Sequence, residues 1–392
     1  MAGALDGIRV LEMANVISGP FTGMLLADLG AEVIKVEMPG SGDPFRAWAG
    51  DDSAITASFA AYNRGKKSVA INIQSEKGQA VYRRLAVTVD VVLENFRPGT
   101  LDRYGIGYDD LKKENPRLVY CSITGMGSVG PYKSRPTYDA IAQGMSGLWS
   151  QLTDMADPEP VGPPISDQLT GLYGVYGVLG ALVSRSLTGQ GQRLEVSMLG
   201  ASIGFQPLVM ADHLMDGLIA TKSSRPHNSQ SYAFVGSDNL PFAIHLSSPQ
   251  KFWEGLARAV GRPELVTDPR FEKKPGRVEH YDVLRQELMQ AFSARPRDEW
   301  LAIRAEHDVP AGPIYTIAEA VQDPQVQAIK MVRTFGEGER ALNLLGFPVD
   351  YHGTPSLEGL APPHLGEHNS EVLAGLGLSQ DEIEDMNRDG AA

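Results

Sequence analysis

The first half of the sequence alternates between two hydrophobic periods, and this alternation restricts most strongly the folds open to the chain. Short apolar runs typical of strands lie at 8–12, 32–37, 67–73, 90–94, 117–123 and 193–198. Segments typical of helices lie between them, at 21–29, 76–86, 138–149 and 168–185. Because neighbouring parallel strands need a long crossover connection, usually a helix, the pattern predicts an α/β fold with a parallel sheet and helices on its faces.

The pattern changes after about residue 220. A long helix is predicted at 199–215, and the segment 224–231 is polar and punctuated. Two strand-like runs, 232–235 and 241–245, predict an antiparallel hairpin around 236–239. Helical segments follow at 249–260, 281–292 and 297–306, and the chain from Met331 returns to strand-like and loop segments before a helix near 370–376. We therefore expect a large Rossmann-like domain from residues 1–220 and 330–392, and a smaller α+β domain from residues 221–329.

Composition narrows the class of protein. A chain of 392 residues with 42% apolar content can bury a substantial core and is long enough for two domains. A net charge of −13 argues against nucleic acid as a partner. The single cysteine, Cys121, excludes disulfides within the chain, and the eight histidines lack metal-ligand spacing, so no metal site is expected.

No segment has the pattern of a membrane span or a secretory signal. The N-terminus lacks a basic start followed by a long apolar run. The most apolar stretch, 172–183, is too short to span a bilayer. We expect a cytoplasmic protein with no membrane association.

One glycine motif suggests a dinucleotide site. Gly125, Gly127 and Gly130 fit the spacing G-x-G-x-x-G after a predicted strand. A dinucleotide site also needs a helix immediately behind the motif, and the residues from Pro131 to Pro136 cannot open one cleanly. We interpret the motif as a glycine-rich loop and do not expect nicotinamide binding.

Basic residues gather at three places in the first half of the chain. They are Arg64 with Lys66 and Lys67, Arg97 with Arg103, and Lys133 with Arg135. Each group follows a predicted strand or lies between two, which is where α/β sheets bind phosphorylated ligands. A solvated surface is the alternative interpretation.

Asp167 admits two interpretations. It precedes a predicted helix rich in small residues, with glycines at 171, 174, 177 and 180 that leave room for another backbone or a ligand. It is then either a helix N-cap or a functional carboxylate. Free N–H groups and the helix dipole would favour its anion by roughly 0.3–1 kcal/mol. An ionised carboxylate is a competent nucleophile toward an activated acyl group. The local sequence leaves both interpretations open.

A set of segments in a constant order carries a family resemblance. They include Leu5-Asp-Gly-Ile-Arg-Val-Leu-Glu12 and Glu94-Asn-Phe-Arg-Pro-Gly99, and the others lie at 29–37, 40–43, 63–68, 138–143, 188–192, 309–313 and 365–368. Together they resemble the class III CoA-transferase family, of the formyl-CoA transferase and carnitine CoA-transferase type. The resemblance implies an enzyme that moves coenzyme A (CoA) from an acyl-CoA donor to a small carboxylic acid.

The same resemblance implies a mechanism and a site. Asp167 falls on the family's catalytic aspartate, which attacks the thioester to give a mixed anhydride and then accepts CoA as an aspartyl thioester. This path retains the thioester energy, so neither ATP nor a permanently bound cofactor is expected. The CoA contacts carried over are Val16, Ser18, Ile71, Gln74, Asn95, Phe96, Arg103, Thr137 and Tyr138. Family members form interlocked homodimers, so a second copy of the chain is the expected protein partner.

Three departures bear on the substrate. Formyl-CoA transferases carry glutamine where this chain has Ile17, arginine where it has Met38, and a glycine-rich loop where it has 228–234. These differences favour an acid larger than formate or oxalate, and we expect a dicarboxylate such as succinate, with succinyl-CoA as donor. Polar residues of 225–232 are candidates for binding a second carboxylate, and a polar linker is the alternative.

Two rival functions remain. An α-methylacyl-CoA racemase needs a histidine as well as the aspartate, and Tyr138 stands where that histidine would be. A tyrosine, with a pKa of about 10, is a poor base at neutral pH. A noncatalytic CoA-binding protein would bind CoA without modifying Asp167. The sequence identifies neither the donor nor the acceptor.

Overall fold

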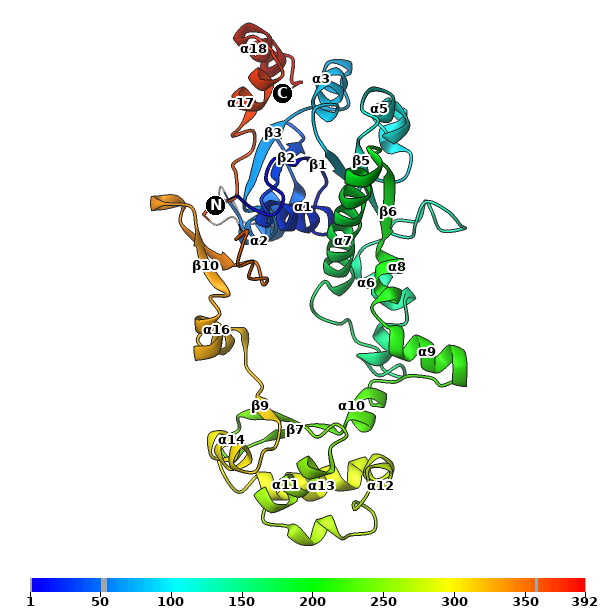
Figure 1. The fold of residues 1–392 in the computed structure, drawn as a ribbon, viewed down its shortest axis with the longest axis vertical. Helices are drawn as coiled ribbons and strands as arrows, with labels where there is room; N and C mark the ends of the chain where they lie inside the picture. The colour runs from blue at the N-terminus through cyan, green and yellow to red at the C-terminus, as the bar shows by residue number, and fades with distance from the viewer. Residues whose placement is uncertain (1, 51–54, 357–358, 392) are drawn as a thin grey trace. The chain divides into compact units, whose positions relative to one another are not determined.

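The computed structural model describes residues 2–50, 55–356 and 359–391, which form two compact units. Unit 1 comprises Met1–Leu148, Gly162–Pro207 and Ile329–Ala392. Unit 2 comprises Trp149–Val161 and Leu208–Ala328. Because the second unit is inserted between parts of the first, unit 1 is built from segments far apart in the sequence (Figure 1).

Unit 1 is organised around a parallel sheet. Its strands are β1 (Arg9–Met13), β2 (Glu32–Glu37), β3 (Lys66–Ala70), β4 (Val91–Glu94), β5 (Val119–Thr124) and β6 (Arg193–Ser197). They lie in the order β3-β2-β1-β4-β5-β6, and every pairing is parallel. This is the strand order of Rossmann folds, with the topological switch between β1 and β4. The prediction of a mixed α/β fold with a parallel sheet is confirmed.

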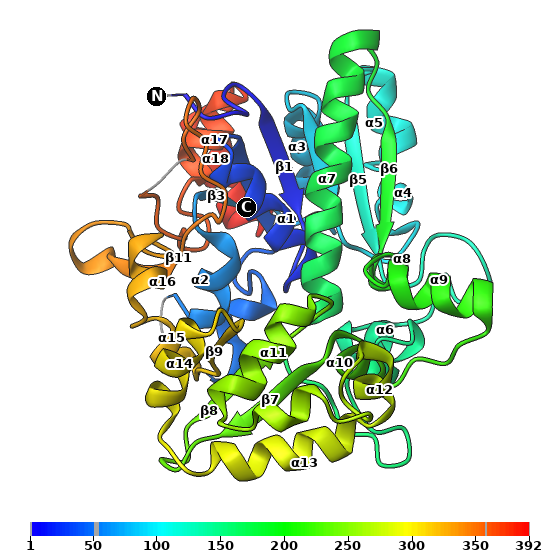
Figure 2. The same cartoon turned by 60° about the horizontal axis from the view of Figure 1, so that its bottom comes forward.

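Helices cover both faces of this sheet, as Figure 2 shows for α1 and α7 on one face and α3 and α5 on the other. The helices of unit 1 are α1 (Ser18–Asp28), α2 (Ala57–Asn63), α3 (Glu76–Ala86), α4 (Thr100–Arg103), α5 (Tyr108–Glu114), α6 (Asp139–Met145), α7 (Ile165–Thr188), α8 (Met198–Gly204), α17 (Asn369–Gly375) and α18 (Gln380–Arg388). A two-stranded antiparallel sheet, β10 (Val332–Phe335) with β11 (Leu342–Leu345), completes the unit.

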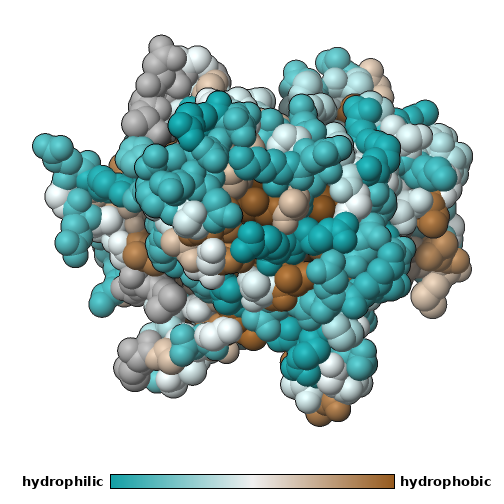
Figure 3. Space-filling model, turned by 90° about the horizontal axis from the view of Figure 1, so that it is seen from above, coloured by the Kyte–Doolittle hydropathy of each residue, from teal (hydrophilic) through white to brown (hydrophobic). Residues whose placement is uncertain are grey.

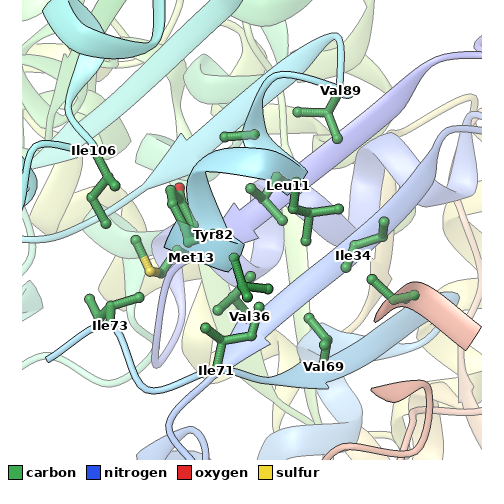
Figure 4. Close-up of a cluster of buried hydrophobic side chains, with 14 of the residues drawn as sticks. Leu11, Met13, Ile34, Val36, Val69, Ile71, Ile73, Tyr82, Val89 and Ile106 are labelled. Atoms are coloured by element: carbon green, nitrogen blue, oxygen red, sulfur yellow. The ribbon is translucent and has the colours of Figure 1, made fainter. Parts of the chain in front are cut away.

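Alternation along the strands divides the core in two. Val10 packs toward α1 and α7, whereas Leu11 packs toward α3, because successive strand side chains point to opposite faces. The cluster on the α3 face includes Tyr82 and the neighbouring strand residues shown in Figure 4, and Val372 and Leu373 of α17 join it. The carboxyl-terminal helices thus bury part of one face of the sheet. Seen from the end that carries α3, α5 and α17, the surface is mainly hydrophilic, with a smaller hydrophobic area near its middle (Figure 3).

Unit 2 has its own core. It contains a three-stranded antiparallel sheet of β7 (Ser231–Val235), β8 (Pro241–His245) and β9 (Ala311–Pro313). Its helices are α9 (Pro207–Asp216), α10 (Ser224–Ser229), α11 (Gln250–Ala259), α12 (Lys274–Glu279), α13 (Tyr281–Phe292), α14 (Arg297–Glu306), α15 (Ile317–Ala320) and α16 (Pro324–Ala328). Aromatic side chains dominate the buried cluster, including Phe242, Trp253, Phe292 and Trp300. The predicted hairpin is confirmed as β7 and β8.

One predicted element is wrong. The long helix expected at 199–215 is two helices, α8 and α9, because Pro207 lacks an N–H and disfavours helical geometry in the residue before it. The polar segment 224–231, for which no element was predicted, contains α10 over most of its length. Among the described residues, none of the helices combines the length and apolar character that crossing a bilayer requires.

Candidate active site

A pocket of about 270 Å³ lies in unit 1 where the strand order reverses. Its walls come from the segments that follow the carboxyl ends of β1, β4 and β5, at 15–18, 95–98 and 123–126, and from 133–138, Asp167 and Met198. Crevices at such switch points are the usual ligand sites of open α/β sheets. The pocket is therefore the candidate active site.

Asp167 is the third residue of α7, so the N-cap interpretation is wrong. The cap is Pro164, whose side chain makes no capping hydrogen bond. Close packing of α1 on α7 brings Ser18 next to Asp167. A Cβ on Gly171 would lie 2.7 Å from the Phe21 ring and 3.1 Å from the Ser18 carbonyl oxygen. The expectation that glycines in this helix allow close approach of another backbone is confirmed at Gly171.

The environment of Asp167 favours its protonated form. Burial, followed by the negative charge of Asp139, raises the pKa of Asp167 to about 7, while a hydrogen bond donated by the Ser18 hydroxyl lowers it. The sequence argument expected the helix N-terminus to favour the anion, and the structure shows the opposite net direction. Desolvation is the largest of these influences, although the Asp167 residue is only half-buried in the pocket wall.

Asp139, the first residue of α6, is a neighbour of Asp167 that sequence reasoning missed. Its Oδ1 accepts a hydrogen bond from the Asp167 backbone N–H at 3.2 Å, and its Oδ2 accepts one from the Gln143 side chain. Asp139 thus ties α6 to the start of α7. The only signal for Asp139 in the sequence was its position directly after Tyr138 in the segment 138–143, which resembles the family.

Most of the predicted CoA contacts come together. Val16, Ser18, Asn95, Phe96, Thr137 and Tyr138 line the pocket with Asp167. Ile71 and Gln74 line a second pocket of about 260 Å³, which shares Asn15 and Phe96 with the first and also contains Met38. Arg103 lines neither pocket, and its guanidinium donates to Thr100 on its own helix at 3.3 Å.

Two predicted contacts, Asn95 and Val16, have structural features that the sequence did not indicate. The Asn95 side chain accepts a hydrogen bond from the Asn15 N–H at 3.0 Å and donates one to the Asn15 carbonyl at 2.8 Å. Asn95 therefore joins the segments after β1 and β4 across the switch point. Val16 has a φ of +70°, a left-handed conformation that costs a β-branched residue energy.

Three exposed cations line the pocket in addition to the predicted contacts. Arg97, Lys133 and Arg135 belong to the basic groups seen in the sequence, and Arg97 extends the positive lining toward β4. Cations at the open side of a pocket suit an anionic ligand. The signal in the sequence was their position after predicted strands.

The glycine motif is a loop, as interpreted from the sequence. No helix begins directly after Gly130, and the loop is held by Ser128, whose N–H donates to Glu195 at 2.6 Å. A Cβ on Gly125 would lie 2.4 Å from Cβ of Thr137, so the absence of a side chain at Gly125 allows Thr137 to pack against this loop. Within the described ranges, no group of three or more His, Cys, Asp or Glu side chains is arranged to hold a metal ion.

Of the polar residues in unit 2 considered for a second carboxylate, Arg225 and Asn228 are exposed, whereas the other three have partners within the unit. Gln230 is fully buried and accepts a hydrogen bond from Arg277 at 2.7 Å. Tyr232 is buried and stacks on Tyr281, whose other neighbour is the ring of His227. These side chains build the core of unit 2.

Comparisons with known proteins agree over almost the whole chain. The sequence model of CoA-transferase family III matches residues 5–369. The chain is 35% identical to a succinyl-CoA–D-citramalate CoA-transferase of Chloroflexus aurantiacus, over 97% of this chain and 96% of that protein. It is 36% identical to a succinate–glutarate CoA-transferase of Agrobacterium fabrum, over 95% of each. The structure is similar to that of a CAIB/BAIF family protein from Brucella suis, with a TM-score of 0.85 and 34% identity, over 96% of this chain and 100% of that one.

Proposed function

The chain belongs to CoA-transferase family III and is an enzyme that transfers CoA between an acyl-CoA and a carboxylic acid, and from this premise we propose that Asp167 is its nucleophile. One observation carries the proposal. Among the described residues that line the pocket, Asp167 supplies the only carboxylate.

The proposed reaction has two reversible halves. An oxygen of the Asp167 carboxylate attacks the thioester carbon, and CoA leaves as a thiolate, so that a mixed anhydride forms. The thiolate then attacks the aspartyl carbonyl, which releases the donor acid and leaves an aspartyl-CoA thioester. The acceptor carboxylate attacks this thioester, and CoA leaves as a thiolate, so that a second mixed anhydride forms. The thiolate then attacks the acceptor carbonyl of that anhydride, which gives the acceptor's CoA thioester and frees the Asp167 carboxylate. Each step exchanges one carboxylate or thiolate for another, so no further reactant is consumed.

A raised pKa suits this role. A carboxylate with a pKa of about 7 is a better nucleophile than an ordinary one, and about half of it is ionised at neutral pH. The amino end of α1 borders the pocket through Ile17 and Ser18. Because the first N–H groups of a helix lack partners within the helix, they can stabilise the oxyanion of each tetrahedral intermediate. Burial also limits hydrolysis of the anhydride.

We propose that acyl-CoA lies along the two pockets that share Asn15 and Phe96. In this placement the thioester lies at Asp167, and Arg97, Lys133 and Arg135 attract the anionic groups of CoA. Succinyl-CoA is the proposed donor, because two similar transferases are named for succinyl-CoA or succinate and pair it with another acid. Ile17 in the pocket wall, an apolar side chain, also suits a donor with a longer acyl chain than formyl.

The racemase alternative lacks the histidine that it needs in this pocket. No histidine is among the described residues that line it, and Tyr138 has a mostly exposed side chain.

A second copy of the chain is the proposed protein partner. Leu172, Tyr176, Val183 and Leu187 share one face of α7, and each is at least half exposed. The interlocked form of the dimer and a cytoplasmic location are predictions from the sequence.

Sedimentation velocity tests the dimer. The 42.3 kDa chain should sediment as a dimer at micromolar concentration, and Tyr176→Arg should shift it toward monomer. A monomeric wild-type protein would contradict the proposal.

Covalent trapping tests the nucleophile. The protein is incubated with succinyl-CoA, quenched with hydroxylamine and digested, and the peptide containing Asp167 is analysed by mass spectrometry. A donor-dependent hydroxamate at Asp167 is expected, with less label from formyl-CoA. Asp167→Ala should abolish transfer and labelling while CoA binding persists, whereas Asp139→Asn, the neighbouring carboxyl group, should still be labelled. Transfer near the wild-type rate in Asp167→Ala would refute the assignment.

A further inference from the structure

Beside the pocket, a group of four buried charged side chains in unit 1 contact one another, and the proposed reaction does not use them. They are Glu12 of β1, Lys35 of β2, Lys66 of β3, and Asp43, which follows β2 in the chain. Each is at most 4% exposed. Lys35 Nζ lies 3.0 Å from Glu12 Oε1 and 2.9 Å from Asp43 Oδ2, and Lys66 Nζ lies 2.7 Å from Glu12 Oε2. We call these four residues the buried ionic cluster. With two carboxylates and two ammonium groups, it is balanced in charge.

Stability is a weak explanation for such a cluster. Desolvation of buried ions offsets most of their mutual attraction, and apolar side chains of similar volume often serve as well. A cluster of this kind can instead impose one geometry on the backbone around it. The backbone groups that the cluster binds therefore indicate which part of the chain it holds in place.

The buried ionic cluster clamps the turn formed by Ala14, Asn15 and Val16. Lys35 Nζ donates to the Ala14 carbonyl oxygen at 2.6 Å. The Asp43 carboxylate accepts the Val16 N–H, with both oxygens at 3.2 Å. Held from both sides, Val16 keeps its φ of +70°, which an unrestrained valine avoids.

This turn leads directly into the catalytic groups. Ser18, two residues after Val16, begins α1 and lines the same pocket as Asp167, and its hydroxyl lowers the pKa of that carboxyl group as a hydrogen-bond donor. The turn and the helix are in close contact, since a Cβ on Gly19 would lie 2.2 Å from the Ala14 Cβ. A shift of the turn would therefore move Ser18 relative to Asp167.

We propose that the buried ionic cluster fixes the Ala14–Val16 turn so that Ser18 is held against Asp167, which makes Asp43 a positioning residue for acyl transfer. The inference rests on the proposed role of Asp167 as nucleophile. Without the Asp43 charge, the turn relaxes and the Ser18 hydroxyl moves away. The Asp167 anion then loses a donor, so acylation becomes slower at neutral pH and its pH midpoint rises.

A double-mutant cycle tests the link. The rate of Asp167 acylation by succinyl-CoA is measured in a single turnover, with hydroxylamine quench, as a function of pH. The proteins are the wild type, Asp43→Asn, Ser18→Ala and the double variant. Each single variant should acylate about tenfold or more slowly at neutral pH, as expected when a hydrogen bond to a charged group is lost. The double variant should be no slower than the slower single variant, because both changes remove the same hydrogen bond.

Two further variants make the cycle decisive. Lys35→Met combined with Asp43→Asn removes one charge of each sign and leaves Glu12 paired with Lys66. This pair should fold even where Asp43→Asn alone does not, and it should show the same slow acylation. Glu32→Gln is the control, since Glu32 forms ion pairs with Arg9 and Lys67 in the same sheet at partly exposed positions, and it should acylate at the wild-type rate.

Several results would overturn the inference. They are a wild-type rate in both cluster variants, losses for Asp43 and Ser18 that multiply, or a failure of both cluster variants to fold, which would assign the cluster to stability alone. An absence of label at Asp167 in the wild-type protein is a different result, because it would refute the proposed nucleophile instead.

Discussion

Gly23 of α1 lies against the buried carboxylate of Glu12, and Gly23→Ala tests how rigid that region is. A Cβ at this position would lie 1.8 Å from Glu12 Oε2. Contacts of a Cβ below 3.0 Å are essentially never seen, so the carboxylate must move by about 1.2 Å. Its two oxygens are held by Lys35 at 3.0 Å and by Lys66 at 2.7 Å, and all three side chains are buried. A shift of this size breaks at least one of the two ion pairs.

The magnitude follows from two opposing effects. Breaking a buried ion pair costs about 3–5 kcal/mol, whereas alanine in a helix gains about 1 kcal/mol over glycine. The free energy of unfolding of unit 1 should therefore fall by about 2–4 kcal/mol. For a unit of this size, that corresponds to a Tm lower by roughly 5–10 °C.

Differential scanning calorimetry measures the effect. Gly375→Ala is the matched control, because Gly375 ends α17 with no atom within 4 Å of the added Cβ, and its Tm should change little. An unchanged Tm in Gly23→Ala would show that the Glu12 carboxylate can move freely, and it would refute the argument that this cluster is rigid.

Two further predictions concern ionisation and burial. The kcat/KM for the acyl-CoA donor should rise with pH to a plateau, with a midpoint near the Asp167 pKa of about 7, and Asp139→Asn should lower that midpoint by removing a negative charge. Burial raises the pKa of Asp167 above its value in the unfolded chain. The Asp167 carboxyl group by itself therefore lowers the free energy of unfolding as pH rises from about 4 to about 7. A midpoint near about 4 in the pH profile of kcat/KM would contradict both predictions. Arg304→Met should stabilise unit 2 by about 1–2 kcal/mol, because among the described residues Nη1 and Nη2 of this buried guanidinium have no hydrogen-bond partner. Arg277→Met, which removes a guanidinium bound to the Gln230 side chain and the Phe271 carbonyl, should lower the Tm instead, and equal effects of the two changes on the Tm would refute the distinction.

The elements of unit 1 were largely predictable because their periods are local. Each strand of the parallel sheet lies within a few residues of its predicted run, since short runs rich in β-branched and other apolar residues are visible in the sequence. The helix expected at 199–215 failed for an equally local reason, the effect of Pro207 on the residue before it. Asp167 as a candidate nucleophile came from a family resemblance, because an aspartate near a helix start is ambiguous on its own.

The state of the site depended on residues far apart in the chain. Asn15 meets Asn95 only because β1 and β4 are neighbours in the sheet, and Val16 meets Asp43 only because the chain returns across β2. The sequence therefore determined which elements form and which side chains are available. The tertiary structure decided the sign of the Asp167 pKa shift, because the pocket wall around Asp167 removes water from the carboxylate, and desolvation depends on packing between segments that no local pattern specifies.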